Sequence, residues 1–220
     1  MEENARTDEG RPEAWLEIRR GEVHFCAAGF EPAPRLPFPA MDNQSLRNLI
    51  RTVPDWPKPG INFYDICSIM ERPDAFAWTV NLMQVLCGER EVEAIVCPDA
   101  RGFLWGAAVG FGMRLPVHLA RKPGKLPGKI VTQSYEYEYS SASISMQADT
   151  DLRGKRVALI DDVLATGGTA LAIVELLSSH FGVPASQVTY SCVLNLKFLP
   201  GEERLLARGV EVRTLVDFHE

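Results

Sequence analysis

The sequence has few cysteines, and they lack the spacings typical of a cross-linked or redox-active protein. None of the five forms a C-x-x-C pair. An odd number of cysteines also argues against a disulfide framework. We therefore expect reduced thiols, most of them buried in apolar surroundings.

The sequence also lacks long apolar runs and large clusters of basic residues. Its first eleven residues carry four acidic side chains beside two arginines. This composition fits neither a secretory signal nor an Arg-rich, acid-poor transit peptide. The net charge is −6, and adjacent basic residues occur only as pairs such as Arg121-Lys122. A nucleic-acid partner and a membrane are therefore not expected, and the cytoplasm is the default location.

Two common nucleotide-binding motifs are missing as well. Residues 124–129 contain glycines and lysines, but not at the G-x-x-x-x-G-K-[ST] spacing of a P-loop. Gly110 and Gly112 are not followed by the third glycine of a dinucleotide-binding fingerprint, because Leu115 stands in its place. Any phosphate site must therefore be of another kind.

The chain of 220 residues has the length and composition of one soluble α/β domain, with 46% hydrophobic and 24% charged residues. Five prolines interrupt residues 1–41, which show no sustained periodicity. We expect this segment to be an N-terminal extension, partly disordered, that precedes a domain over residues 42–220.

Patterns typical of strands and helices alternate after the extension. Apolar residues at helical spacing predict helices over 42–53, 73–87, 103–113 and 170–181. Short apolar runs predict strands over 94–97, 117–120, 157–160 and 188–194. This order predicts an α/β fold with a mostly parallel central sheet and helices on both faces. Residues 132–146 alternate with a period of two and predict a polar, two-stranded flap outside that sheet.

The most informative segment is 157–169, which reads Val-Ala-Leu-Ile-Asp-Asp-Val-Leu-Ala-Thr-Gly-Gly-Thr. Its turn joins a predicted strand to a predicted helix, which is where parallel α/β sheets bind ligands. The first N–H groups of a helix have no intrahelical partners and lie at the positive end of its dipole. Gly167 and Gly168 would let a phosphate approach these groups, and the hydroxyls of Thr166 and Thr169 would add donors.

The two adjacent acids before this turn suit a different part of a ligand. Asp161 and Asp162 would repel a phosphate, but each carboxylate can accept a hydrogen bond from one of the two vicinal hydroxyls of a ribose. The segment therefore predicts a sugar-phosphate site, with the phosphate at the turn and the ribose at the acids.

This segment resembles the phosphoribosyl pyrophosphate signature of the type I phosphoribosyltransferases. The resemblance implies the fold of that family, a parallel α/β sheet with a small hood and a mobile β flap. It also implies that seven residues bind the sugar phosphate: Asp161, Asp162, Ala165, Thr166, Gly167, Gly168 and Thr169.

Residues 54–66 resemble the base-binding segment of the adenine branch of this family. The resemblance implies that Phe63 stacks on the purine and that Ile61 and Asn62 lie beside the base. Asn62 and Tyr64 depart from the small aliphatic residue and the arginine that are common there. A preference for hypoxanthine, guanine or xanthine therefore stays open as an alternative.

Residues 97–104 resemble the pyrophosphate loop of the family, between a strand and a helix. Arg101 would supply a planar, permanently charged donor for pyrophosphate oxygens. Residues 121–128 resemble a second cationic segment, in which Lys125 is the preferred candidate. The implied pyrophosphate-binding residues are Asp99, Ala100, Arg101, Arg121, Lys122, Lys125 and Tyr139. The resemblance also implies a cis peptide bond between Asp99 and Ala100.

Residues 134–139 resemble the mobile catalytic loop, and Glu138 and Tyr139 match its Glu-Tyr pair. Ser140 replaces the glycine expected next. The resemblance implies that Glu138 acts as the general acid or base of the reaction.

As a whole, the resemblance implies purine salvage: adenine and 5-phosphoribosyl 1-pyrophosphate would give AMP and pyrophosphate. It further implies Mg²⁺ held mainly by substrate phosphates and water, without metal-ligating side chains, and a homodimer. The alternative from another class is a regulator that binds the sugar donor without catalysis. Such regulators carry a DNA-binding domain, and an acidic, proline-interrupted extension is a poor candidate for one.

Overall fold

The computed structural model describes residues 14–19, 22–27, 41–137 and 140–220. The chain divides into two units, residues Met1–Pro37 and Phe38–Glu220. In the first unit, β1 (Ala14–Arg19) pairs with β2 (Glu22–Ala27) as an antiparallel hairpin. Part of the N-terminal extension is thus a two-stranded hairpin.

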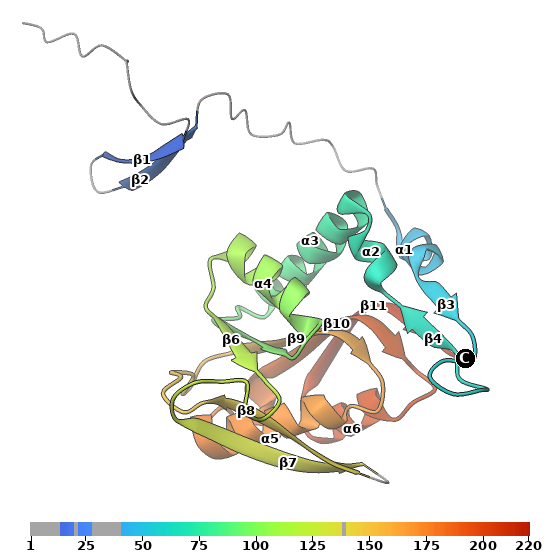
Figure 1. Ribbon diagram of the computed structural model, residues 1–220. Helices are drawn as coiled ribbons and strands as arrows, with labels where there is room; N and C mark the ends of the chain where they lie inside the picture. Colours follow the sequence, from blue (N-terminus) through green and yellow to red (C-terminus); the bar gives the residue numbers. More distant parts are fainter. Residues whose placement is uncertain (1–13, 20–21, 28–40, 138–139) are drawn as a thin grey trace, which may run out of the picture. The chain divides into compact units, whose positions relative to one another are not determined.

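A sheet of five parallel strands forms the centre of the second unit (Figure 1). Every neighbouring pair of its strands runs in the same direction, which confirms the predicted parallel sheet. In spatial order the strands are β11 (Glu211–Phe218), β10 (Val188–Leu196), β9 (Val157–Leu164), β5 (Ala94–Pro98) and β6 (Val117–Ala120). The edge strand β11 was not predicted.

Helices cover both faces of this sheet (Figure 1). One face carries α3 (Pro73–Glu89) and α4 (Gly102–Met113), and the other carries α5 (Gly168–Phe181) and α6 (Gly201–Ala207). The short 3₁₀ helix η1 (Ala185–Gln187) precedes β10.

The central strand β9 is buried on both faces, as its continuous apolar run predicts. Successive residues of a strand point to opposite faces. Leu159 accordingly belongs to the core beneath α5, together with Ile173, while Ile160 belongs to the core beneath α4, together with Trp105. Two apolar layers therefore hold the strand that leads into the candidate site.

A small hood precedes α3, formed by α1 (Asn43–Leu49), β3 (Arg51–Val53), β4 (Phe63–Asp65) and α2 (Cys67–Met70). The predicted helix over 42–53 is wrong for its last four residues, because β3 pairs antiparallel with β4. Asp42 caps α1 by accepting a hydrogen bond from the Ser45 N–H at 2.7 Å. The helix ends at Leu49 because Ile50 is extended, with φ −72° and ψ 117°, and the residues after it pair with β4.

The predicted flap is a separate antiparallel pair of strands, β7 (Ile130–Tyr137) and β8 (Ser140–Gln147). Its base is less polar than the sequence pattern indicates. Ile144 and Met146 of β8 are buried in the core beneath α5. The base of the flap is thus anchored beside the helix that follows the phosphate-binding turn.

None of the helices in the described ranges is long and apolar enough to cross a membrane.

Candidate active site

The turn after β9 forms the first part of the candidate site. We call residues 165–169 the phosphate loop. Together with Asp161 and Tyr190 they line a cavity of about 140 Å³. Helix α5 begins within the loop, at Gly168, so the first N–H groups of the helix lie at the cavity. Gly167 has a φ of 74°, in the left-handed region that favours glycine.

The strand before this loop is longer than predicted. It runs to Leu164, so Asp161 and Asp162 lie within β9 and not after it. The two acids therefore have different surroundings. Asp161 lines the cavity with the phosphate loop, whereas the buried carboxylate of Asp162 receives the guanidinium of Arg101.

The loop after β5, residues 99–101, forms the second part of the site and is called the pyrophosphate loop below. The peptide bond between Asp99 and Ala100 is cis, as the family resemblance implied. Gly102 then begins α4. A Cβ atom at Gly102 would lie 2.7 Å from Cδ of Pro98 and 3.0 Å from the carbonyl oxygen of Ile160. Glycine therefore lets α4 approach β9 closely enough for Arg101 to reach Asp162.

The pair of Arg101 and Asp162 joins the two parts of the site. The Nε–H of Arg101 donates to Oδ2 of Asp162, whose side chain is only 7% exposed. The guanidinium carbon also lies 5.9 Å from the centre of the Phe63 ring, within range of a cation–π contact. In the free protein, Arg101 thus contacts both Asp162, a predicted ribose-binding residue, and Phe63, a predicted base-binding residue.

The pKa of Asp161 is raised well above its usual range, first by burial and then by the neighbouring Asp162 carboxylate. Its Oδ1 accepts a hydrogen bond from the Asp162 N–H at 2.8 Å. A protonated Asp161 could donate a hydrogen bond as well as accept one. The two acids can therefore offer a ribose different hydrogen-bonding groups.

The second cationic segment reaches the site through Arg121. Its Nε lies 3.1 Å from Oδ2 of Asp99, and its Nη1 donates to the backbone carbonyl of Lys125 at 3.1 Å. The side chains of Lys122 and Lys125 are exposed. The structure thus brings Arg121 to the pyrophosphate loop and connects Lys125 to it through its carbonyl, although sequence reasoning preferred the Lys125 ammonium.

The predicted base-binding residues lie at the start of β4. Phe63 is half-buried and packs against Trp56, with ring centres 4.4 Å apart in an edge-on arrangement. Ile61 and Asn62 are exposed. Trp56 was not predicted as part of the site. The sequence indicated a role for Trp56 only through its position as an aromatic residue within the matched segment 54–66.

Tyr64 points away from this ring, as the alternation of β4 requires. Its hydroxyl donates to the backbone carbonyl of Glu220 at 2.5 Å, and its ring packs against Phe218. Tyr64, which departs from the family pattern, therefore affects the packing of the hood. It does not contribute to the face of β4 on which the Phe63 ring lies.

The predicted catalytic residue Glu138 and its neighbour Tyr139 lie outside the described residues, between the ends of β7 and β8. Within the described ranges, no group of three or more acidic, histidine or cysteine side chains is arranged to hold a metal ion.

The fold and the two loops define an α/β protein with two turns suited to anions at the carboxyl ends of the neighbouring parallel strands β9 and β5. The sequence profile of the phosphoribosyl transferase domain matches residues 74–182. An adenine phosphoribosyltransferase from Actinobacillus succinogenes is 42% identical over 79% of this chain and 94% of its own length. One from Solidesulfovibrio magneticus is 43% identical over 76% of this chain and 95% of its own length.

Solved structures agree with these relatives. A crystal structure of adenine phosphoribosyltransferase from Thermoanaerobacter pseudethanolicus has a TM-score of 0.73 at 33% identity, and it covers 80% of this chain and 99% of its own. The Giardia lamblia enzyme, complexed with 9-deazaadenine, has a TM-score of 0.76 at 28% identity, covering 82% and 100%. The chain belongs to the adenine phosphoribosyltransferase family.

Proposed function

We propose that the protein transfers the phosphoribosyl group of 5-phosphoribosyl 1-pyrophosphate to adenine and so releases AMP and pyrophosphate, a purine salvage reaction. The observation that carries this proposal is the placement of two different anion-binding loops on the neighbouring strands β9 and β5, joined by the pair of Arg101 and Asp162. A related enzyme from Trypanosoma brucei was crystallised with AMP, pyrophosphate and ribose-5-phosphate. Such ligands would occupy both loops at once.

The proposed binding mode follows from the donors and acceptors at the site. The 5′-phosphate would accept hydrogen bonds from the phosphate loop, and the ribose hydroxyls would bind Asp161 and Asp162. The pyrophosphate would replace Asp162 as the partner of the Arg101 guanidinium. It would also bind the guanidinium of Arg121. Because 42% of the Arg101 side chain is exposed, its guanidinium can turn from the acid to the ligand. Adenine would stack on Phe63.

The proposed chemistry is a substitution at C1 of the ribose. The C1–O bond breaks, its electron pair leaves with pyrophosphate, and N9 of adenine forms the new bond from the opposite face. The departing pyrophosphate gains negative charge, which the guanidinium groups of Arg101 and Arg121 would stabilise. Glu138 is the proposed acid or base for the purine proton. A flap that covers the site would exclude water, which could otherwise hydrolyse the donor.

Magnesium fits the hard oxygen ligands of this site. Phosphate oxygens, water and the carboxylates of Asp161 and Asp162 are the ligand types that Mg²⁺ prefers. When bound, Mg²⁺ would neutralise part of the pyrophosphate charge. Since Asp162 is already paired with Arg101, the ion would depend mainly on the substrate for its ligands.

A homodimer in the cytoplasm is part of the proposal. Helix α4 exposes Leu104, Ala107 and Phe111, which share one face at helical spacing, and Phe111 is 89% exposed. An apolar stripe of this kind favours a subunit interface. Analytical ultracentrifugation should show a dimer for the parent protein and a monomer for Phe111→Asp. A monomeric parent protein would refute the assignment.

The test of the activity is product formation from adenine, hypoxanthine, guanine and xanthine with the same sugar donor and Mg²⁺. Adenine should give AMP far faster than the other bases give their nucleotides. A preference for another purine would support the alternative specificity, which Asn62 leaves open. Donor binding without product from any base would support the regulator.

Glu138→Gln should keep substrate binding but lower kcat by about 10² to 10⁴, the range for a lost general acid or base. Glu136→Gln is the matched control, since it lies two residues away on the same segment but outside the Glu-Tyr pair. A loss below about threefold for Glu138→Gln would remove that residue from the mechanism.

A further inference from the structure

The phosphate loop is held by two elements, the flap strand β7 and the helix α6, of which α6 was not connected with the site by the sequence patterns. The N–H of Gly201 in α6 donates to the carbonyl of Ala165 at 3.1 Å. One turn further along α6, Nη1 of Arg204 donates to the carbonyl of Thr166 at 2.8 Å. Both acceptors belong to the turn between β9 and α5.

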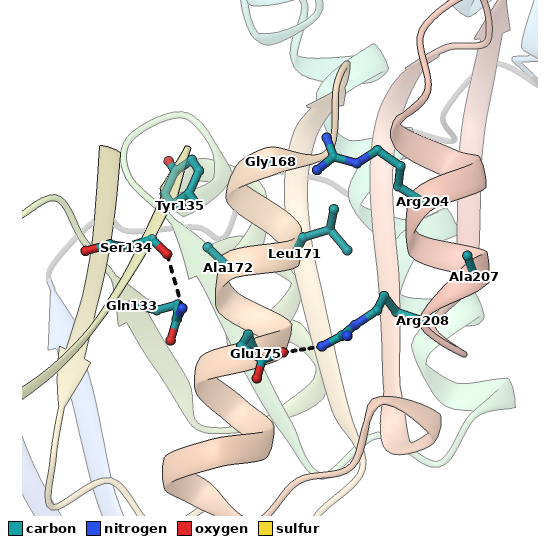
Figure 2. A pocket seen from close by; sticks show the side chains of 10 residues that line it. All are labelled: Gln133, Ser134, Tyr135, Gly168, Leu171, Ala172, Glu175, Arg204, Ala207 and Arg208. Atoms are coloured by element: carbon teal, nitrogen blue, oxygen red, sulfur yellow. Dashed lines mark hydrogen bonds and ion pairs between the residues drawn. The ribbon is translucent and has the colours of Figure 1, made fainter. Parts of the chain in front are cut away.

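A third contact comes from the flap. The hydroxyl of Tyr135 in β7 lies 3.1 Å from Oγ1 of Thr169. Figure 2 shows Tyr135 and Arg204 on opposite sides of a second cavity, of about 460 Å³, with Gly168 between them. The loop is therefore held from β7 on one side and from α6 on the other.

The contacts from α6 determine where the loop's N–H groups point. In a trans peptide group the carbonyl and the N–H point in opposite directions. When α6 holds the carbonyls of Ala165 and Thr166 on the outer side, the N–H groups of Thr166 and Gly167 must face the opposite side, toward the cavity of about 140 Å³ that the loop lines. Two donors for an anion are thus oriented before any ligand binds.

The close approach of α6 depends on a glycine. A Cβ atom at Gly201 would lie 2.2 Å from the carbonyl oxygen of Ala165 and 3.0 Å from the backbone nitrogen of Gly167. Real Cβ atoms do not come so close to backbone atoms, so any larger residue would displace α6 or the loop. Gly201 thus lets α6 pack closely against the phosphate loop, although it is not itself a predicted substrate-binding residue.

The contact from the flap acts on a side-chain donor. A threonine hydroxyl has one proton and two acceptor lone pairs. If Tyr135 donates to Oγ1 of Thr169, the threonine proton stays available for a phosphate oxygen. Tyr135 also packs against the core beneath α5, which fixes its ring.

We propose that Gly201, Arg204 and Tyr135 are positioning residues that set the affinity of the phosphate loop for the 5′-phosphate of the substrate and of AMP. This inference rests on the proposed function, because it takes the phosphate loop as the 5′-phosphate site. Gly201 and Arg204 lie beyond residue 182, where the match to the phosphoribosyl transferase profile ends.

The test compares ligands with and without the 5′-phosphate by calorimetric titration of the full chain with AMP and with adenine. Arg204→Ala and Tyr135→Phe should each weaken AMP binding about three- to tenfold, the usual effect of one lost hydrogen bond, and leave adenine binding unchanged. Arg208→Ala is the matched control for Arg204, because Arg208 is the C-cap residue of α6, about one turn further on, and pairs with Glu175 (Figure 2). It should bind AMP like the parent protein.

Gly201→Ala should weaken AMP binding at least tenfold, whereas Gly88→Ala, with no atom within 4 Å of the added methyl, should not. Thermal unfolding checks that each variant is folded. If Gly201→Ala does not fold, Arg204→Ala and Tyr135→Phe still decide the question.

A double-mutant cycle tests whether Tyr135 acts through Thr169. Thr169→Val should weaken AMP binding, and adding Tyr135→Phe to it should cause no further loss.

AMP affinities unchanged in Arg204→Ala and Tyr135→Phe would overturn the inference, and so would equal losses for AMP and adenine. Failure of the proposed function has a different signature, since the parent protein would then form no AMP in the assay described above.

Discussion

The phosphate loop and the pyrophosphate loop lie at the ends of neighbouring parallel strands, yet they offer an anion different donors. Residues 165–169 include no cationic side chain and present backbone N–H groups and threonine hydroxyls. Residues 99–101 include Arg101, whose charge is paired with Asp162 in the free protein. The phosphate loop presents neutral donors in fixed positions. The pyrophosphate loop carries the guanidinium of Arg101, which must leave Asp162 before it can bind an anion.

This difference matches what happens to each phosphate group in the proposed reaction. The 5′-phosphate keeps its charge from substrate to AMP, so fixed dipoles suit it. The pyrophosphate gains charge as the C1–O bond breaks, and a cation that turns toward it would stabilise that change. The comparison implies that damage to the first loop should affect binding of the 5′-phosphate, and that damage to the second should affect the rate together with binding of the released pyrophosphate.

The largest effect is expected for Arg101→Ala, which should lower kcat by about 10² to 10³, as for a lost donor at a developing negative charge. Arg101→Lys should recover part of this loss, because it keeps the charge but not the planar donor pair. Steady-state kinetics with saturating substrates measure both. A change confined to KM would make Arg101 a simple binding residue and remove the contrast between the loops.

Asp162→Ala and Asp161→Ala should weaken binding of the sugar donor about 10- to 150-fold. These factors correspond to the roughly 1.5 to 3 kcal/mol of a hydrogen bond to a charged group. Adenine affinity measured alone should hardly change. Titration of each variant with each ligand decides the matter, and equal weakening of both ligands would mean that the acids are structural.

Asp161 should also make the folding stability depend on pH. Because the pKa of Asp161 is raised in the folded protein, the unfolded chain releases this proton first, and folding stability falls as the pH rises from about 4 through the folded-state pKa. Asp161→Asn removes this penalty, so its Tm advantage over the parent should grow across that range. Tm curves that run parallel at all pH values would contradict the raised pKa.

The smallest effect is expected for removal of residues 1–40. A chain starting at Met41 should keep both loops and retain activity within a few-fold, because the removed segment has no sustained apolar periodicity. Its Tm should match that of the full chain. A drop of more than about 5 °C, about 1 to 2 kcal/mol for a domain of this size, would make the extension part of the fold.

The strand–turn–helix units around both loops could be predicted because each depends on local patterns, whereas the role of residues 99–101 came from the family resemblance. An apolar strand, a glycine-containing turn and a helix start are visible within about fifteen residues, as in 157–169. The parallel sheet followed from the alternation of such units. The helix ends differed by at most two residues for α3, α4 and α5.

The contacts between distant segments could not be predicted in this way. Nothing in the local pattern around Arg204 or Gly201 indicates that α6 would hold the phosphate loop, since the contact spans more than thirty residues. The pairing of Arg101 with Asp162 likewise depends on the close packing that Gly102 permits. The prediction for helix α1 extended too far because residues 51–53 pair with β4, a contact that apolar spacing alone does not indicate.

The most direct test of the contrast between the loops is a set of four titrations, in which Thr169→Val and Arg101→Ala are each titrated with AMP and with pyrophosphate in the presence of Mg²⁺. Thr169→Val should lose affinity for AMP and keep it for pyrophosphate, and Arg101→Ala should show the reverse. If each variant weakens both ligands to the same extent, the two loops do not act as separate anion sites, and the account is wrong.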